Sequence, residues 1–321
     1  MKCSVCKVTA VVALPNHSMG FCEECFFRFF TRQVKRAIRK HNMFTYDDRI
    51  LVALSGGKDS LALMYELNQL GYNVTGLHVD LCISNSSTKA RQTVERFCEK
   101  HELKLRVVEL AEEDLAIPDV KQYVNRPICS MCGKIKRYFF NKVAREEGFN
   151  VLATGHNLDD EVGRLFANTL RWDQAYLADQ GPVLPATTGF AAKVKPLCRL
   201  TEFETANYSF LRGIDYHTDP CPYSSGATFT GHKKLLMDLE IRSPGQKFQF
   251  YNAFLKNGKP AFQAVATPEE EIVFPCEICG SPTCVKICGV CRVRKTLKEK
   301  REEAIQADLE RDRVNNDSSR S

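Results

Sequence analysis

Short apolar runs alternate with amphipathic segments through the middle of the chain. The apolar runs are bounded by turn residues and predict buried strands at residues 49–54, 73–79, 103–110 and 151–154. Apolar residues recur at helical spacing in segments 60–70, 88–101, 132–147, 159–170, 202–211 and 232–239. Strands that alternate with helices predict an α/β fold with a parallel sheet covered on both faces.

The chain divides into three predicted parts. Residues 1–27 form a cysteine-rich module, residues 28–270 form the α/β domain, and residues 271–321 hold a second cysteine-rich module and a polar tail. The tail from Gln306 to Ser321 is rich in polar residues, and we expect it to fray or to be disordered.

The composition indicates a globular protein of the cytoplasm. Hydrophobic residues make up 44% of the 321 residues and charged residues 26%. No apolar run approaches the roughly 20 residues that span a bilayer, so we expect no membrane association. The first residues also lack a secretory signal segment.

Fifteen cysteines are many for such a chain. In a reducing compartment they point to metal or redox chemistry rather than to disulfides. Cys82, Cys98 and Cys198 stand alone in the sequence, and we expect them to be small buried hydrophobic residues. Eleven of the other twelve fall into three groups, and the twelfth, Cys284, lies in the sequence between members of the last group.

Two of these groups lie near the ends of the chain and have the spacing of four-cysteine zinc sites. The first comprises Cys3, Cys6, Cys22 and Cys25, with fifteen residues between its two pairs. The second comprises Cys276, Cys279, Cys288 and Cys291, with a shorter gap of eight residues. Tetrahedral Zn²⁺ takes four soft ligands, so we expect two Zn²⁺ ions. His17 and Cys284 are alternative ligands.

Basic residues gather beside both cysteine modules. Segment 28–40 has six basic residues and no acidic one, and segment 286–301 has seven basic residues and one acidic one, Glu299. Either segment alone could be a solvated helix face. Together they are more typical of a nucleic-acid footprint.

A glycine-rich loop follows the first predicted strand and opens the next helix. It comprises Ser55, Gly56, Gly57, Lys58, Asp59 and Ser60. Backbone N–H groups in such a turn, together with a helix N-terminus, bind phosphate. Hydroxyls of Ser55 and Ser60 and the charge of Lys58 would add contacts, and Asp59 could hold Mg²⁺. The spacing is not that of a Walker A loop.

The third cysteine group is central. Cys129 and Cys132 lie one helical turn apart, and Cys221 stands in a Pro-Cys-Pro sequence. Three thiolates suit a [4Fe–4S] cluster with one open iron. A persulfide relay is the rival chemistry, and an inert cysteine pair is the third interpretation.

Acidic and basic residues accompany the central cysteines. Gly155 and Asp160 belong to a Gly-His-Asn-Leu-Asp-Asp sequence after the fourth predicted strand, where parallel sheets bind ligands. Acids there also cap helices. Lys136 and Arg137 lie one turn beyond Cys132 and could stabilise charge that develops during a reaction.

The Ser-Gly-Gly-Lys-Asp-Ser loop resembles that of the PP-loop, or adenine-nucleotide α-hydrolase, superfamily. With the Cys-Ser-Met-Cys and Gly-His-Asn-Leu-Asp-Asp sequences, the chain is similar to the TtcA/TtuA family of tRNA 2-thiolation enzymes over about residues 1–300. The zinc modules at both ends resemble the TtuA and cytosolic wobble-uridine thiolase branch. The resemblance implies a Rossmann-like fold, and adenine bound around His78, Val79 and Asp80.

The resemblance further implies an ATP-dependent tRNA 2-thiouridine synthase. ATP would adenylate the C2 oxygen of a uridine, and sulfur held at Cys129, Cys132 and Cys221 would replace that oxygen. The sulfur donor would be a ubiquitin-like protein with a C-terminal thiocarboxylate or free sulfide, and the enzyme would be a homodimer. The alternatives are a lysidine-type ligase, a thiocytidine synthase, and a non-catalytic zinc-ribbon RNA-binding protein.

Overall fold

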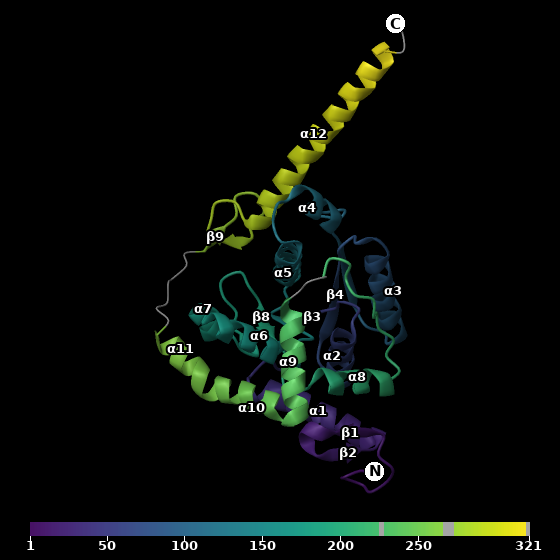
Figure 1. Cartoon of the computed structure of the whole chain (residues 1–321), viewed down its shortest axis with the longest axis vertical. Helices are drawn as coiled ribbons and strands as arrows, with labels where there is room; N and C mark the ends of the chain where they lie inside the picture. The colour runs from purple at the N-terminus through teal and green to yellow at the C-terminus, as the bar shows by residue number, and fades with distance from the viewer. Residues whose placement is uncertain (225–227, 266–272, 319–321) are drawn as a thin grey trace.

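A central α/β domain separates two small cysteine-rich modules (Figure 1). The computed structural model describes residues 1–224, 228–265 and 273–318, and the side chains of these residues except 228–230 and 307–318. The domain boundary expected after residue 270 lies outside the described residues. The boundary expected after residue 27 falls within helix α1 (Glu23–Lys40), which continues from the first module into the central domain.

Among the described residues, six strands form one sheet in the order β5-β4-β3-β6-β8-β7. They are β3 (Ile50–Ala53), β4 (Val74–Asp80), β5 (Leu105–Glu109), β6 (Val151–Thr154), β7 (Val183–Leu184) and β8 (Ala192–Val194). Neighbouring strands are parallel from β5 across the sheet to β8, and β7 pairs antiparallel with β8. The predicted parallel sheet is confirmed, with an antiparallel strand at one edge.

Helices follow the strands along the chain. They are α2 (Lys58–Gln69), α3 (Ser84–Lys100), α4 (Ile117–Tyr123), α5 (Ile128–Glu146), α6 (Leu158–Arg171), α7 (Gln174–Asp179) and α8 (Glu202–Leu211). The sequence pattern missed α4, α7, β7 and β8 because each has at most seven residues. Such short elements show too little periodicity to be recognised.

The sheet buries apolar side chains on both faces. Ile50 and Val52 of β3 belong to a core that includes residues of α1, α2, α6 and α8. Leu51, between them, belongs to a second core with α4, α5 and the C-terminal module. Successive strand residues point to opposite faces, so a continuous apolar run is what a sheet covered on both sides requires.

The terminal modules are small hairpins attached to helices. The first contains β1 (Val12–Leu14), the 3₁₀ helix η1 (Pro15–His17) and β2 (Met19–Phe21), and the second contains β9 (Phe274–Pro275) and β10 (Pro282–Thr283). Helix α12 (Gly289–Ser318) follows the second hairpin and projects from the molecule (Figure 1).

The expectation that residues 306–321 fray is wrong for the part that the structure describes. Helix α12 continues to Ser318, and residues 319–321 lie outside the described residues. Between Val290 and Ser318 the sequence has neither proline nor glycine. Polar composition suggested disorder, but lysine, arginine, glutamate and alanine are also favourable in helices.

A helical arm follows the central domain. It comprises α9 (Thr228–Arg242), α10 (Gln246–Ala253), the π-helix η2 (Phe254–Gly258) and α11 (Lys259–Val265). Tyr251 of α10 donates a hydrogen bond of 2.7 Å to buried Glu161 of α6, and Lys195 lies 2.7 Å from the other oxygen of that carboxylate. These contacts hold the arm against the central domain. Among the described helices, none combines the length and apolarity needed to cross a membrane.

We expect Tyr208→Phe to destabilise the protein more than Tyr251→Phe does. Tyr208 stacks on Phe30 with ring centroids 3.7 Å apart, and its hydroxyl donates to buried Glu66. The other oxygen of Glu66 has no partner among the described residues. Losing the Tyr208 hydroxyl should cost about 1–3 kcal/mol of unfolding free energy, as for an unpaired buried group.

Tyr251→Phe is the matched control, because Glu161 keeps its contact with Lys195. Urea denaturation of the two variants measures the difference. If both variants lose the same unfolding free energy, the lack of a second hydrogen-bond partner for Glu66 does not make the Tyr208 hydroxyl more important than that of Tyr251.

Candidate active site

A cavity of about 500 Å³ opens at the carboxyl ends of the parallel strands. Strand β3 lies between β4 and β6, so the chain turns to one side of β3 after α2 and reaches the other side later. Parallel α/β sheets bind ligands at such a switch point. The cavity is lined from β3 by Ala53, from β4 by His78 and from β6 by Thr154.

The glycine-rich loop forms the floor of this cavity. Ser55, Gly57, Asp59 and Ser60 line it. Gly56 has a φ of +83°, which side chains other than glycine rarely adopt. The Ser60 hydroxyl lies 3.2 Å from both the backbone nitrogen and the hydroxyl of Ser55, and this contact closes the turn. Helix α2 begins at Lys58, so its free N–H groups face the same space.

Gly155 brings the next strand against this loop. A Cβ atom at Gly155 would lie 2.8 Å from the backbone nitrogen of Ser60 and 2.9 Å from its Cα. Such distances are shorter than real Cβ contacts, so only glycine allows this approach. The turn after β6 therefore packs directly on the start of α2.

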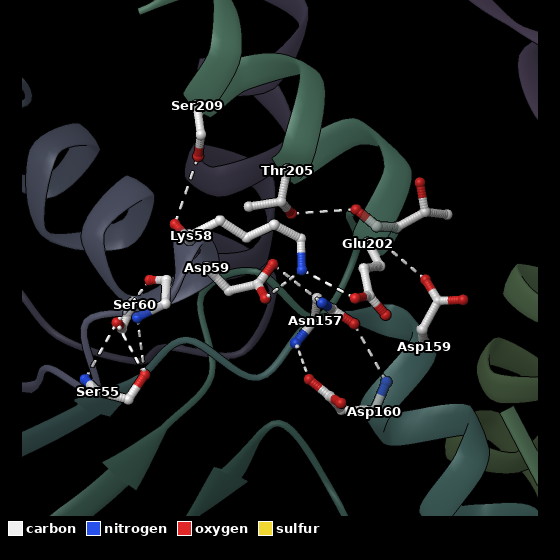
Figure 2. A network of polar contacts seen from close by, with 12 residues as sticks. Ser55, Lys58, Asp59, Ser60, Asn157, Asp159, Asp160, Glu202, Thr205 and Ser209 are labelled. Atoms are coloured by element: carbon white, nitrogen blue, oxygen red, sulfur yellow. Dashed lines mark hydrogen bonds and ion pairs between the residues drawn. The ribbon is translucent and has the colours of Figure 1, made fainter. Parts of the chain in front are cut away.

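A network of charged side chains lies beside the loop (Figure 2). Lys58 Nζ lies 3.1 Å from an oxygen of Asp59 and 2.8 Å from Glu202 at the start of α8. Asn157 donates a 3.1 Å hydrogen bond to the other Asp59 oxygen. Lys58 is directed toward Glu202 in this structure and is not among the residues that line the cavity.

Asn157 also organises the start of α6. Its side chain accepts a hydrogen bond of 3.1 Å from the backbone N–H of Asp160, and the Asp160 carboxylate accepts one from the backbone of Asn157. This capping box fixes Asp160 at the cavity wall. Lys233 of α9 lies 2.6 Å from Asp160 and 3.3 Å from Glu202. The helical arm thus contributes a cation to the network.

Burial and neighbouring charges in this network change the pKa values of its side chains. Burial raises the pKa of Asp59, although Lys58 works against this shift. Burial also opposes the charge on Lys58, but Asp59 and Glu202 hold its pKa above the usual range. Burial likewise disfavours ionised Glu202, yet Lys58 and Lys233 bring its pKa below the usual range. At neutral pH Lys58 and Glu202 are therefore both charged.

Two of the three residues expected near adenine line the cavity. His78 and Val79 line the cavity, whereas Asp80 does not. Asp80 instead accepts a 2.9 Å hydrogen bond from the backbone of Cys82. Buried His78 has its Nδ1 atom 2.9 Å from the Leu54 carbonyl, and burial lowers its pKa. Because a carbonyl only accepts, Nδ1 carries the proton, and Nε2 is an acceptor with no partner among the described residues.

The central cysteines meet at one side of the cavity. Cys221 lines it, and the Cys129 thiol lies 3.4 Å from the carbonyl oxygen of Tyr223. Burial raises the pKa of Cys132; Lys136 works against this, and Cys221 and Cys129 raise it further. The start of α5 and the 221–223 loop are thus brought together, although they are far apart in sequence.

The loop that carries Cys221 is anchored over the glycine-rich loop. The His217 backbone donates a 2.8 Å hydrogen bond to the Gly56 carbonyl, and Asp219 lies 2.7 Å from Lys89 of α3. Of the two basic residues expected near the reaction, Lys136 lines the cavity. Arg137 lines a different cavity on the other side of α5.

The terminal cysteines form two compact groups. In each group of four, the sulfur atoms lie within 4.8 Å of one another. His17 and Cys284 belong to neither group: His17 contacts Glu204 at 2.9 Å, and Cys284 is exposed. Of the solitary cysteines, Cys98 and Cys198 are buried as expected. Cys82 is half-buried and has a φ of +58°, so that expectation is wrong for it.

The two basic segments have different surroundings. In α1, Arg32, Lys35, Arg36 and Arg39 line an open groove beside Tyr46, whose ring stacks on Tyr72 with centroids 4.5 Å apart. In α12, by contrast, Arg294 pairs with Glu113 and Arg301 pairs with Asp114 and Asp119. Acids of another part of the chain thus pair with two of the seven basic residues of the second segment.

Sequence reasoning missed Glu202, Lys233, Asn157 and His217. Glu202 and Lys233 lie on helices that the sequence predicted, but nothing in a helical pattern shows which side chains reach a distant loop. Asn157 belongs to a sequence that was singled out for its acids, and its position immediately before a helix signalled a cap.

Comparisons with known proteins agree with this geometry. Residues 27–226 match the PP-loop domain family, and residues 2–27 match the N-terminal LIM domain of the 2-thiouridine synthetase TtuA. A tRNA-5-methyluridine(54) 2-sulfurtransferase of Thermus thermophilus is 42% identical over 294 residues, which cover 91% of each chain. An enzyme of the same name from Pyrococcus horikoshii is 41% identical over 302 residues, 93% of this chain and 95% of that one.

A solved structure is also similar along nearly the whole chain. The U34-tRNA thiolase NcsA from Methanococcus maripaludis, solved with its [4Fe–4S] cluster, superposes with a TM-score of 0.75. It is 27% identical in sequence, and the match covers 92% of this chain and 96% of that one. The expected fold class is therefore confirmed.

We expect Gly155→Ala to weaken the binding of ATP by at least about tenfold, equivalent to roughly 1.4 kcal/mol. The added methyl group would press on the Ser60 backbone and displace the phosphate-binding turn. Titration with a fluorescent ATP analogue measures the affinity. Gly231→Ala in α9 is the matched control, because a Cβ there meets nothing within 4 Å. Equal ATP affinity of the two variants would contradict the role of the close approach.

Proposed function

Because this chain belongs to the TtcA/TtuA family of PP-loop tRNA 2-thiolation enzymes, we propose that it synthesises 2-thiouridine in tRNA at the expense of ATP. The observation that carries the proposal is the meeting of two features in one cavity. The phosphate-binding loop forms its floor, and Cys221 lines its wall beside Cys129 and Cys132. A nucleotide-dependent activation and a sulfur transfer can therefore occur on the same base.

We further propose that the target is the uridine at position 54 of the T-loop. Support comes from sequence similarity: two relatives at 42% and 41% identity are named for 5-methyluridine 54, whereas the U34 thiolase is 27% identical. The wobble position is the alternative target.

The residues of the loop have distinct roles in this proposal. The N–H groups at the start of α2 and the hydroxyls of Ser55 and Ser60 bind the phosphates of ATP. Lys58 is held by Glu202, and a turn of its side chain would exchange this carboxylate for a phosphate. His78 and Val79 border the adenine, and Nε2 of His78 offers it a hydrogen-bond acceptor.

The reaction proceeds in two displacements, the first at the α-phosphorus of ATP and the second at C2 of the base. The C2 oxygen of uridine attacks the α-phosphorus of ATP, and the bond to pyrophosphate breaks. A sulfur nucleophile then adds to C2, the bond between C2 and its oxygen breaks, and AMP leaves with that oxygen. Lys136 is the cavity cation closest in sequence to the cysteines, and it stabilises negative charge on the adenylate.

The three central cysteines fit a [4Fe–4S] cluster better than a single metal ion. A tetrahedral ion with metal–sulfur bonds of about 2.3 Å requires sulfurs roughly 3.8 Å apart. Among the described residues, the two terminal groups meet a 4.8 Å limit and the central group does not. The thiolates that hold a cubane [4Fe–4S] cluster bind different iron atoms, so their sulfur atoms stand farther apart than those around a single ion. When bound, the cluster would supply an iron with an open position for sulfur. A persulfide relay is the alternative use of the same thiols.

The two terminal groups fit Zn²⁺. The Sγ atoms of Cys6 and Cys22 are 3.4 Å apart, and those of Cys279 and Cys288 are 3.8 Å apart. Backbone N–H groups lower the pKa of Cys3 to about 6, whereas burial and neighbouring thiols raise the pKa of Cys25 to about 12. Four thiols this close cannot all ionise without a cation, which a divalent metal would supply.

The carboxylates in the cavity fit Mg²⁺. Asp59 and Asp160 both line the cavity, and hard divalent cations take oxygen ligands. When bound, Mg²⁺ would neutralise charge on the departing pyrophosphate. A ubiquitin-like thiocarboxylated protein or free sulfide as the donor, a homodimeric assembly and a cytoplasmic location stay predictions of the sequence.

Thiolation of an unmodified tRNA transcript tests the function. The protein is reconstituted anaerobically with iron and sulfide, then supplied with ATP, Mg²⁺ and tRNA, and nucleosides are identified by mass spectrometry. We expect 2-thiouridine that requires ATP and that disappears when U54, but not U34, is replaced by cytidine. Thiocytidine, or product lost only with U34, would contradict the proposed base or position.

Cys221→Ala should abolish this product and leave ATP affinity within about twofold of the wild type, because Cys221 lies outside the phosphate-binding loop. Cys98→Ala is the matched control, since Cys98 is a cysteine outside all three groups that lines neither this cavity nor the one beside Arg137. Thiolation by Cys221→Ala at the wild-type rate would remove this cysteine from the chemistry.

Metal analysis tests the terminal modules. We expect two zinc ions per chain, one for each four-cysteine group, and one fewer in Cys22→Ser. Cys198→Ala replaces a buried cysteine outside both groups and should keep two. Inductively coupled plasma mass spectrometry gives the count, and wild-type zinc content in Cys22→Ser would contradict the assignment.

A further inference from the structure

A second cavity, of about 450 Å³, lies between α5, the segment around β8 and the C-terminal module. Its chemistry is strongly cationic. Of the described residues that line it, none is acidic and five are basic: Lys134, Arg137, Arg145, Lys193 and Arg292. Gly289, the first residue of the long helix α12, also lines it, so the N-terminus of that helix adds positive potential.

The cations of this cavity differ from those on the neighbouring surface. Toward α4, Lys142 and Arg294 both contact Glu113, at 3.2 and 2.8 Å. Four of the cations that line the cavity form no ion pair with a carboxylate of the described residues: Lys134, Arg137, Lys193 and Arg292. The carboxylates nearby pair with other cations instead. The same helices therefore carry neutralised cations on one side and unneutralised ones on the other.

Two of these side chains are also partly removed from water. Nη1 of Arg145 is buried and has no hydrogen-bond partner among the described residues. Its Nη2 lies 3.5 Å from the Ser281 hydroxyl and 3.7 Å from Glu146, neither of which satisfies Nη1. Lys193 is half-buried, and burial and then the charge of Arg137 lower its pKa. A buried guanidinium donor without an acceptor is costly, and a bound anion would supply the acceptor.

The cavity lies beside the reaction cavity. Lys136 and Phe140 of α5 line the reaction cavity, and the next residues, Arg137 and Asn141, line the cationic one. The two spaces are thus separated by one helix, which is about 10–12 Å across. A strand of a few nucleotides spans such a distance. The C-terminal module closes the far wall through Ser281 and Arg292.

We propose that this cavity binds a backbone phosphate of the tRNA, close in sequence to the uridine that enters the reaction cavity. The proposal rests on the proposed function and specifies the part of the surface that positions its substrate. The C-terminal module then has a role in substrate binding, because Arg292 and the start of α12 complete a phosphate site whose other half is α5. Phosphate contacts fix the register of a nucleic acid on a protein without reading its sequence.

The test removes two cations on opposite walls, in a Lys193→Gln/Arg292→Gln variant. Affinity for an unmodified tRNA transcript is measured by fluorescence anisotropy over a series of salt concentrations. We expect the Kd to rise about tenfold, and the slope of log K against log salt to become shallower by roughly 0.7–0.9 for each lost phosphate contact. ATP affinity should equal that of the wild type, which verifies folding of the variant.

A Lys142→Gln/Arg106→Gln variant is the matched control. It loses the same charge, but from cations that pair with Glu113 and Glu147. Its tRNA affinity and salt slope should stay within about twofold of the wild type, since these charges face acids rather than a cavity. Arg145→Gln alone removes the buried donor. It is a second, independent test and should also weaken tRNA binding.

Three outcomes would overturn the inference. Wild-type Kd and salt slope in Lys193→Gln/Arg292→Gln would show that no phosphate is bound here, while the proposed thiolation stands. Equally weakened tRNA binding in the control variant would show that the effect comes from the change in net charge alone. Unchanged tRNA binding, with thiolation lost only when a thiocarboxylated protein is the donor, would assign the cavity to that protein. Failure of the wild type to bind tRNA would instead refute the proposed function.

Discussion

The contact between Gly155 and the backbone of Ser60 is the constraint on which the site depends. It brings the turn after β6 against the start of α2, closer than any side chain would permit. This approach is available because β3 and β6 are adjacent parallel strands whose carboxyl ends reach the same edge. Asp59 and Asn157 then meet at 3.1 Å, and the helical arm contributes Lys233 to the same charged network.

The same edge receives a loop from much later in the chain. His217 bonds to Gly56, so the segment that carries Cys221 is fixed over the phosphate loop, next to the start of α5. In the proposed mechanism, phosphate binding and sulfur chemistry therefore share one cavity without sharing residues. Apolar cores on both faces hold the sheet, and the polar groups that we propose to carry the chemistry lie beyond its end.

Much of this organisation could be predicted from the sequence. The four longer parallel strands and the glycine-rich loop have strong local patterns, and the cysteine pairs have fixed spacings. The rest depends on tertiary contacts. Glu202 holds Lys58 across 144 residues, and no periodicity marks either as a partner. Arg137 follows Lys136 directly yet faces another cavity, because successive helix residues point about 100° apart. The polar tail was mistaken for a disordered segment because composition alone does not separate a solvated helix from a coil.

The transfer of one oxygen atom tests the central claim that ATP activates the uridine carbonyl. A tRNA labelled with oxygen-18 at C2 of uridine 54 is thiolated in a single turnover, and the AMP released is analysed by mass spectrometry. Attack of the carbonyl oxygen on the α-phosphorus predicts that the label is found in AMP. Unlabelled AMP, formed together with 2-thiouridine, would show that water cleaves the nucleotide and that the loop does not activate the base by adenylation.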